Sequence, residues 1–139
     1  MIREHARGDD VIVASFLDHN STLFKANAPE IGTSVPTVQV AVAKGAGSPP
    51  FAPEGSHPGM GVTLGHVAFQ VPVDFSGIPV INREFVDDAH ARGIAVQAWT
   101  INDCETMVQL LDWGVDGIMS DRPLLLEKVL NEGEAACAP

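Results

Sequence analysis

The chain has 139 residues, 45% of them hydrophobic, and a formal net charge of −10 at pH 7. This length suits one domain or part of one, with enough apolar residues for a buried core. The eight Lys and Arg residues are scattered, which argues against nucleic acid and anionic membrane surfaces as partners. No apolar run approaches the ~20 residues of a membrane-spanning helix, so we expect no transmembrane segment.

Cysteine usage and the N-terminal residues bear on the compartment. Cys104 and Cys137 are too few and too far apart in the sequence for a disulfide scaffold or a zinc site. We therefore expect two free thiols in a reducing compartment. The chain does not begin with the charged, apolar and small-residue pattern of a signal peptide. The sequence as given predicts a cytoplasmic location and leaves open whether a longer parent is exported.

The first half of the chain alternates between strand and helix patterns. Apolar, β-branched runs predict strands, and a weaker apolar spacing predicts one helix. In chain order these are a strand over residues 11–16, a helix over 17–28, and strands over 31–35 and 66–71. Gly, Pro and Ser dominate residues 45–61, and this composition predicts a long loop.

The second half continues the alternation with clearer helix boundaries. Asn82 predicts the N-cap of a helix with Phe85, Val86 and Ala89 on one apolar face. The elements expected after it are a strand over 94–101, a helix over 105–112, a strand over 115–119, a helix over 124–130 that opens with Pro123, and a flexible tail over 133–139.

The tetrapeptide His-Ala-Arg-Gly occurs twice, at residues 5–8 and 90–93. A histidine and an arginine beside a glycine suit either a phosphate site or the end of a helix. In the second copy, His90 and Arg92 would lie in the last turn, at the negative end of the helix, and Gly93 would supply the left-handed conformation that ends it. An apolar strand-like run follows each copy, so we interpret both as helix ends.

Strands without polar alternation, separated by helices, predict a parallel sheet in an α/β fold. An open doubly wound sheet and a (β/α) barrel both fit this order. The sequence lacks Gly-x-Gly-x-x-Gly and a Walker loop, which lowers support for a nucleotide-binding open sheet. About five strands are predicted, whereas a closed barrel takes eight strands and ~250 residues. We therefore expect a partial (β/α)8 TIM barrel over residues 1–132, roughly its last five βα units.

Residues 89–130 read AHARGIAVQAWTINDCETMVQLLDWGVDGIMSDRPLLLEKVL. This segment resembles the C-terminal end of the glycerophosphodiester phosphodiesterase family: a helix ending Ala-His-x-x-Gly, a strand ending Trp-Thr-x-Asn, then Gly-Val-Asp-Gly-Ile-x-x-Asp-Arg-Pro. VIVASF, residues 11–16, resembles the family's Ser-Phe strand, and FQVP, residues 69–72, the strand before its penultimate unit. The resemblance spans about residues 10–130 and is looser over 36–65.

The resemblance implies (β/α)8 barrels that hydrolyse glycerophosphodiesters to glycerol 3-phosphate and an alcohol, with a divalent cation, Mg or Ca. It also implies acid–base chemistry by two histidines, one in a first-strand His-Arg-Gly, and metal-binding carboxylates on the second and third strands. None of these motifs can be placed on this sequence. His19, His57 and His66 share no metal-type spacing. We therefore expect no catalytic residue and no bound cation in this chain.

Four residues form the predicted substrate-binding set. The resemblance implies that Trp99 lines the pocket wall near the glycerol moiety, the alternative being a Trp in the barrel core. Gln70 would bond a substrate hydroxyl or a phosphate-side water, or else satisfy a neighbouring backbone group. Phe16 and Asn102 complete the set, although Asn102, like Asp121, also suits a helix N-cap.

Three hypotheses for function follow. The chain is the C-terminal portion of a glycerophosphodiester phosphodiesterase, inactive alone, with a small-molecule glycerophosphodiester as ligand. Alternatively, it is a non-catalytic partial barrel that self-associates or complements an N-terminal fragment, because a partial parallel sheet exposes edge strands. As a third hypothesis, the gene encodes a longer enzyme, with His-Arg-Gly and Glu-x-Lys encoded upstream of Met1.

Overall fold

The computed structural model describes residues 2–15, 17–35, 66–75 and 77–138. The predicted loop over 45–61 lies outside these residues. The elements in chain order are η1 (Arg3–His5), η2 (Gly8–Asp10), β1 (Ile12–Val13), α1 (Asp18–Asn27), β2 (Gly32–Val35), β3 (His66–Val71), β4 (Asp74–Phe75), β5 (Ile78–Pro79), α3 (Arg83–Ala91), β6 (Ala95–Ala98), α4 (Cys104–Asp112), β7 (Gly117–Ile118), α5 (Pro123–Glu132) and η3 (Gly133–Cys137).

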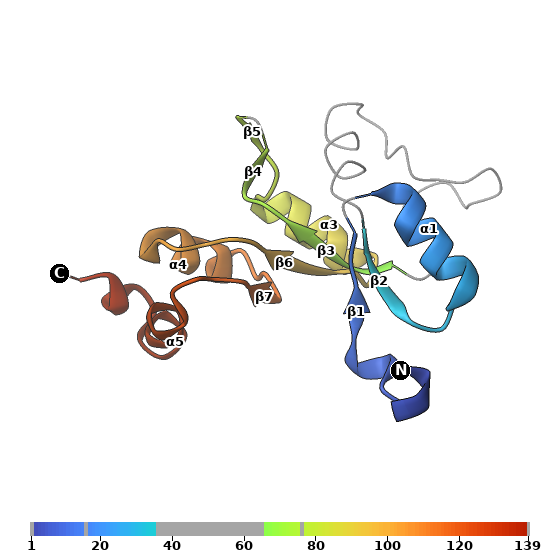
Figure 1. The fold of residues 1–139 in the computed structure, drawn as a ribbon. Coiled ribbons are helices and arrows are strands. Elements are labelled where there is room, and N and C mark those ends of the chain that lie inside the picture. Colours follow the sequence, from blue (N-terminus) through green and yellow to red (C-terminus); the bar gives the residue numbers. More distant parts are fainter. Residues whose placement is uncertain (1, 16, 36–65, 76, 139) are drawn as a thin grey trace.

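Five parallel strands form one curled sheet in the order β1-β2-β3-β6-β7 (Figure 1). Helices α1, α3 and α4 lie in the connections between successive parallel strands, which is the strand–helix–strand order of a (β/α) barrel. The expected α/β class with a parallel sheet is confirmed, and the curl makes the sheet a half-barrel. A separate antiparallel hairpin, β4–β5, follows β3 and was not predicted.

The hydrophobic core lies between the outer face of the sheet and the helices. Val71 of β3 and Val96 of β6 are fully buried there against Val86 of α3 and Met107 and Leu110 of α4. Because side chains alternate along a strand, the strand residues next to Val71 on β3 and next to Val96 on β6 face the inner side of the half-barrel. The outer face therefore stabilises the fold, and the inner face carries the polar groups of the site.

The two His-Ala-Arg-Gly copies end helices in different ways. At the second copy, Gly93 adopts φ 71° after α3, as predicted, and the Asn82 carboxamide oxygen caps the other end of α3 by accepting from Phe85 N. At the first copy the left-handed residue is Ala6, with φ 52°, after the single turn of η1. Gly8 instead begins η2. The second copy thus confirms the predicted glycine stop, and the first ends its helix without one.

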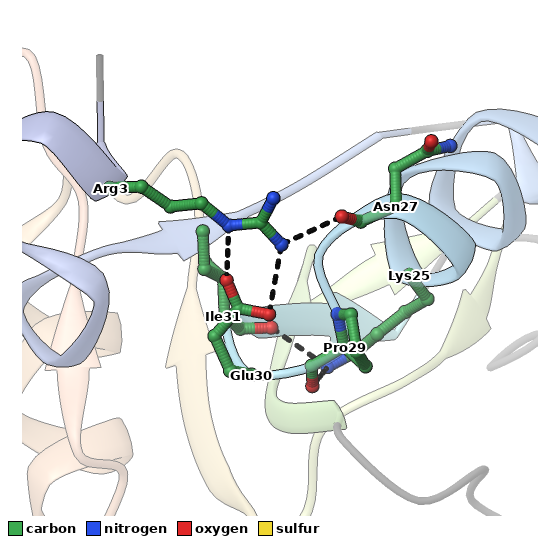
Figure 2. Close-up of polar contacts among 6 residues, drawn as sticks. All are labelled: Arg3, Lys25, Asn27, Pro29, Glu30 and Ile31. Atoms are coloured by element: carbon green, nitrogen blue, oxygen red, sulfur yellow. Dashed lines mark hydrogen bonds and ion pairs between the residues drawn. The ribbon is translucent and has the colours of Figure 1, made fainter.

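Arg3 links the N-terminal turn to the loop between α1 and β2. Its guanidinium donates to both carboxylate oxygens of Glu30, at 2.6 and 3.1 Å, and to the carbonyl of Asn27 at 2.7 Å (Figure 2). Lys25 Nζ donates to the carbonyl of Ile31 at 2.8 Å in the same loop. The hydrogen bond from Arg3 lowers the pKa of Glu30. These contacts hold the start of β2 beside the N-terminal turn.

Cys104 and Cys137 form a disulfide, with their Cα atoms 5.5 Å apart. The prediction of two free thiols is therefore wrong, and the expectation of a reducing, cytoplasmic compartment loses that support. The physical reason is a reversal at Gly133, where η3 turns back and packs against both α4 and α5. The chain end expected as a flexible tail is thus structured through Cys137, and Ala136 is buried in the core.

Within the described residues, no helix combines the length and apolar character needed to cross a lipid bilayer.

Candidate substrate pocket

A cavity of about 360 Å³ lies at the C-terminal ends of the parallel strands. Small-molecule sites occupy this end of a parallel barrel, and their volumes start near ~300 Å³. The described residues that line the cavity come from or directly follow β1, β2, β3, β6 and β7: Ala14, Ser15, Ser34, Val35, Gln70, Trp99, Thr100 and Met119.

The pocket combines an apolar wall with a few neutral polar groups. Trp99 follows β6, and its backbone N–H donates to the carbonyl of Val71 at 3.1 Å. Met119 follows β7, and its carbonyl accepts from Ile101 N at 2.9 Å. These backbone bonds continue the sheet beyond its regular strands and hold the indole and the thioether at the cavity. None of the described lining residues is ionisable at neutral pH.

The two serines at the pocket also serve the local fold. Ser15 Oγ accepts from Leu17 N at 3.1 Å and from Asn20 Nδ2 at 3.3 Å, at the start of α1. Ser34 is buried, and its hydroxyl donates to the carbonyl of Val35 at 3.3 Å. The serine side chains are therefore held in fixed orientations by α1 and β2.

Gln70 and Gln97 form a polar pair on the inner face of the half-barrel. They are register partners on β3 and β6, and Gln70 Nε2 donates to Gln97 Oε1 at 2.7 Å. Gly117 of β7 is the register partner of Gln97 on the other side. A Cβ at Gly117 would lie 3.2 Å from Gln97 Cγ, so the glycine leaves room for the Gln97 side chain. We call Gln70, Gln97 and Gly117 the glutamine rung.

The structure brings two of the four predicted site residues together. Trp99 and Gln70 line the same cavity. Phe16 lies outside the described residues. Asn102 is not among the residues that line the cavity. The substrate-binding roles of all four stay predictions.

Asn102 joins the loop after β6 to the loop after β7. Its Nδ2 donates to Asp121 Oδ2 at 2.9 Å, and its Oδ1 accepts from Ser120 Oγ at 3.1 Å and from Asp121 N at 2.9 Å. Arg122 Nη1 donates to the Asn102 carbonyl at 3.1 Å. Asp121 is therefore bound to Asn102 and does not cap α5, whose N-cap position is Arg122.

The second His-Ala-Arg-Gly copy lies at the opposite end of the sheet from the cavity. His90 Nε2 lies 2.8 Å from Asp116 Oδ2, which also accepts from Val96 N at 2.7 Å. Burial raises the pKa of Asp116, but the hydrogen bonds from Val96 and His90 outweigh it, and the net pKa is lowered. His90 thus serves the junction that precedes β7, away from the pocket.

The described lining residues do not fit a divalent cation. Magnesium and calcium prefer carboxylate oxygens, whereas this part of the pocket offers hydroxyl and amide groups only. Across the described ranges, no three His, Cys, Asp or Glu side chains are grouped to hold a metal ion. His66, the first residue of β3, has its Nδ1 2.9 Å from Thr33 Oγ1.

Comparison with known proteins agrees with this architecture. The model of the glycerophosphoryl diester phosphodiesterase family matches residues 1–125. The chain belongs to this family. A relative named "Probable glycerophosphodiester phosphodiesterase 2", from Mycobacterium tuberculosis, is 46% identical over 61 residues, which cover 44% of this chain and 23% of the relative.

Solved structures of similar fold include the following three proteins. A protein from Silicibacter pomeroyi DSS-3, named "Putative glycerophosphoryl diester phosphodiesterase", has a TM-score of 0.66 and a sequence identity of 22%, and the match covers 94% of this chain and 41% of that protein. For an Oleispira antarctica phosphodiesterase the TM-score is 0.60 and the sequence identity is 22%, and the match covers 87% of this chain and 42% of that protein. For a glycerophosphodiester phosphodiesterase from Parabacteroides distasonis the TM-score is 0.63 and the sequence identity is 18%, and the match covers 94% of this chain and 47% of that protein. This chain thus spans less than half the length of each, and the partial (β/α)8 barrel is confirmed.

Sequence reasoning missed Gln97 and Met119 as neighbours of the site. The two-residue period of a strand was available as a signal, because Gln97 and Trp99 fall on the same face of the predicted strand over 94–101. That period does not say which residue of another strand lies beside Gln97. Met119 is the last residue of the predicted strand over 115–119, and an apolar residue at that position suits the hydrophobic core as well as it suits a pocket.

Proposed function

We propose that this pocket binds the glycerol portion of a glycerophosphodiester. The observation that carries the proposal is the joint placement of Trp99 and Gln70 in one cavity at the C-terminal ends of the strands. An indole face packs on the carbon chain of a polyol, while an amide bonds its hydroxyl groups. The Oleispira antarctica phosphodiesterase was solved with the product sn-glycerol 3-phosphate, which supports a ligand of this class.

The neutrality of the described lining favours the glycerol portion over the phosphate. Phosphate recognition uses Arg, Lys, backbone N–H groups or a metal ion, and the described lining residues include no Arg or Lys. Hydroxyl groups of a polyol need only neutral donors and acceptors. We therefore place the glycerol carbons and hydroxyls against Trp99 and Gln70.

We further propose that the chain does not hydrolyse its ligand by itself. Hydrolysis of a phosphodiester needs a positioned acid and base, and the family resemblance implies a cation as well. The described lining residues offer no ionisable side chain for either role. Family membership thus supports the proposed ligand class, and the neutral pocket supports binding without turnover.

The test is a titration of the purified chain with glycerophosphocholine, followed by NMR because weak binding is measurable by this method. Saturable binding that weakens about tenfold or more in Trp99→Ala is expected, because the variant loses the indole contact area. Trp113→Phe is the control, since Trp113 packs on the core and not at the cavity. Absence of binding by the wild type would contradict the proposed ligand.

The second measurement is release of choline from glycerophosphocholine with Mg²⁺ or Ca²⁺ added. We expect no release above that of buffer. Release that stops on adding a chelator would contradict the proposed lack of turnover while leaving the ligand class in place.

A second candidate function is assembly with another half-barrel. Strands β1 and β7 are the two edges of the described sheet, and Ile12 on β1 is 37% exposed. Edge strands pair readily with further strands. Light scattering tests this candidate: a dimer, or a complex with a separately produced N-terminal half of a family member, supports it, and a cooperatively melting monomer contradicts it.

A further inference from the structure

The glutamine rung fixes the orientation of an amide at the pocket. Gln70 lines the cavity, whereas Gln97 is not among its lining residues and lies beside Gln70 on the next strand. Gln70 Nε2 donates to Gln97 Oε1 at 2.7 Å. Because a carboxamide has its oxygen and nitrogen on opposite sides, this bond turns Gln70 Oε1 away from Gln97.

The other side of Gln97 offers room for its side chain, because the neighbouring residue on β7 is a glycine. Gly117 leaves 3.2 Å between the place of a Cβ and Gln97 Cγ, and 3.7 Å to Gln97 Cδ. The Gln97 side chain therefore lies between the Gln70 amide and the backbone of β7, on three adjacent strands. The hydrogen bond to Gln70 then sets the Gln97 carboxamide, with Oε1 toward Gln70 Nε2.

We infer that Gln97 is a positioning residue, which holds Gln70 so that Gln70 Oε1 accepts a hydrogen bond from a ligand hydroxyl. The inference rests on the proposed function and specifies what the pocket recognises. An acceptor at this position favours ligands with an O–H donor, such as a polyol. A deprotonated phosphate oxygen has no hydrogen to donate, and an alkyl chain has none either. The rung therefore selects hydroxylated over plain alkyl phosphodiesters.

The experiment compares two ligands that differ only in the hydroxyl groups. Glycerophosphocholine and propylphosphocholine share the phosphocholine group and the three-carbon chain. The ratio of their Kd values cancels contributions from the phosphate, the choline and any general weakening of the pocket. We expect the wild type to prefer glycerophosphocholine by about fivefold or more, as the net value of one or two hydrogen bonds suggests.

Two substitutions at Gln97 separate orientation from packing. The methionine of Gln97→Met has a similar length but no comparable acceptor, so Gln70 loses its fixed orientation. The ratio of the two Kd values should then fall toward one. Gln97→Glu keeps an acceptor for Gln70 Nε2 whichever oxygen faces it, and the preference should return. Gln109→Met on the exposed face of α4 is the matched control and should behave as the wild type.

Each outcome decides between the proposals. A preference that survives in Gln97→Met, or a loss of affinity for both ligands in equal measure, overturns the positioning role. A wild type that binds both ligands equally also overturns it and leaves phosphodiester binding in place. A wild type that binds neither ligand overturns the proposed function as well.

A measurement on the wild type alone keeps the inference testable if Gln97→Met does not fold. The side-chain amide signal of Gln70 should shift on titration with glycerophosphocholine and stay in place with propylphosphocholine. Equal shifts with both ligands would overturn the inference.

Discussion

Cys104 and Cys137 are joined across 33 residues of sequence, and their Cα atoms lie 5.5 Å apart. Cys104 is the first residue of α4, and Cys137 is the last residue of η3. Lys128 Nζ also donates to the carbonyl of Ala136 at 3.3 Å, which holds η3 to α5. The covalent link therefore fixes the last βα unit and the chain end to α4, outside the pocket.

Removal of the disulfide should destabilise the chain without altering its pocket. By closing a loop of this length, the disulfide reduces the entropy of the unfolded chain. Its removal should lower the free energy of unfolding by about 3 kcal/mol. For the variant Cys104→Ser/Cys137→Ser we expect a fall in Tm of about 10 °C, measured by circular dichroism. The Kd for glycerophosphocholine should stay unchanged.

Reductant provides the control for this prediction. Dithiothreitol should lower the Tm of the wild type to that of the double variant and leave the double variant unaffected. Thiol titration of the unfolded, unreduced wild type should find no free thiol. Two titratable thiols in protein prepared under oxidising conditions would contradict the disulfide.

Asn102 is expected to stabilise the loops at the mouth of the half-barrel. The variant Asn102→Asp would place a second carboxylate where Asn102 Nδ2 now donates to Asp121 Oδ2. Repulsion between the two carboxylates should lower the free energy of unfolding by about 1 kcal/mol at pH 7. Urea unfolding of the variant and the wild type at pH 7 measures this loss.

The variant Asn102→Ala distinguishes a structural from a ligand-binding role. It removes the side-chain bonds to Ser120 and Asp121 without adding a charge, so its loss of stability should reflect the lost hydrogen bonds alone. Because Asn102 does not line the described cavity, we expect the Kd for glycerophosphocholine to change by less than about twofold. A large change in Kd with an unchanged Tm would instead support the substrate-binding role predicted from the sequence.

Helix boundaries were predictable because their signals are local. Asn82 accepts from Phe85 N three residues later, and Gly93 takes the left-handed conformation that ends α3. Both features depend on residues within one turn, which the sequence displays directly. The alternation of strands and helices likewise predicted a parallel sheet, because strands buried on both faces lack polar alternation.

Contacts between distant segments were not predictable in the same way. The disulfide depends on the reversal at Gly133, and the glutamine rung depends on the register between β3, β6 and β7. A shift of one residue in register would move Gln97 to the other face of the sheet, and a single sequence does not fix that register. The β4–β5 hairpin was missed because its strands have two residues each, too few to show a period.

Asp103 should make the stability of α4 depend on pH. Its carboxylate accepts from Thr106 N at 2.8 Å, and this hydrogen bond lowers its pKa below the ordinary 3.8 despite some desolvation. Because the folded pKa is the lower one, the stabilisation is present above the unfolded value and is lost as the pH falls through the folded value. The expected contribution of the charge at this helix N-terminus is about 0.5 kcal/mol.

The variant Asp103→Asn isolates that contribution, because asparagine also caps helices well but carries no charge. We expect the variant to be slightly less stable than the wild type at pH 7 and equal to it near pH 2.5, by urea unfolding at both pH values. Asp103→Ala, which removes the cap itself, should lose about 1 kcal/mol at pH 7. A difference between the wild type and Asp103→Asn that persists unchanged at pH 2.5 would contradict this assignment.

The absence of a side chain at Gly117 should be required for the position of the Gln97 side chain. A methyl group at this position would lie 3.2 Å from Gln97 Cγ, closer than side-chain carbons normally pack. The variant Gly117→Ala should therefore displace Gln97, lower the free energy of unfolding by about 1 kcal/mol and reduce the preference for glycerophosphocholine over propylphosphocholine. Combining it with Gln97→Ala tests the cause, because the shortened side chain at position 97 leaves room for the methyl group. Gly117→Ala should then cost little further stability, whereas additive losses in the double variant would show that the two residues act independently.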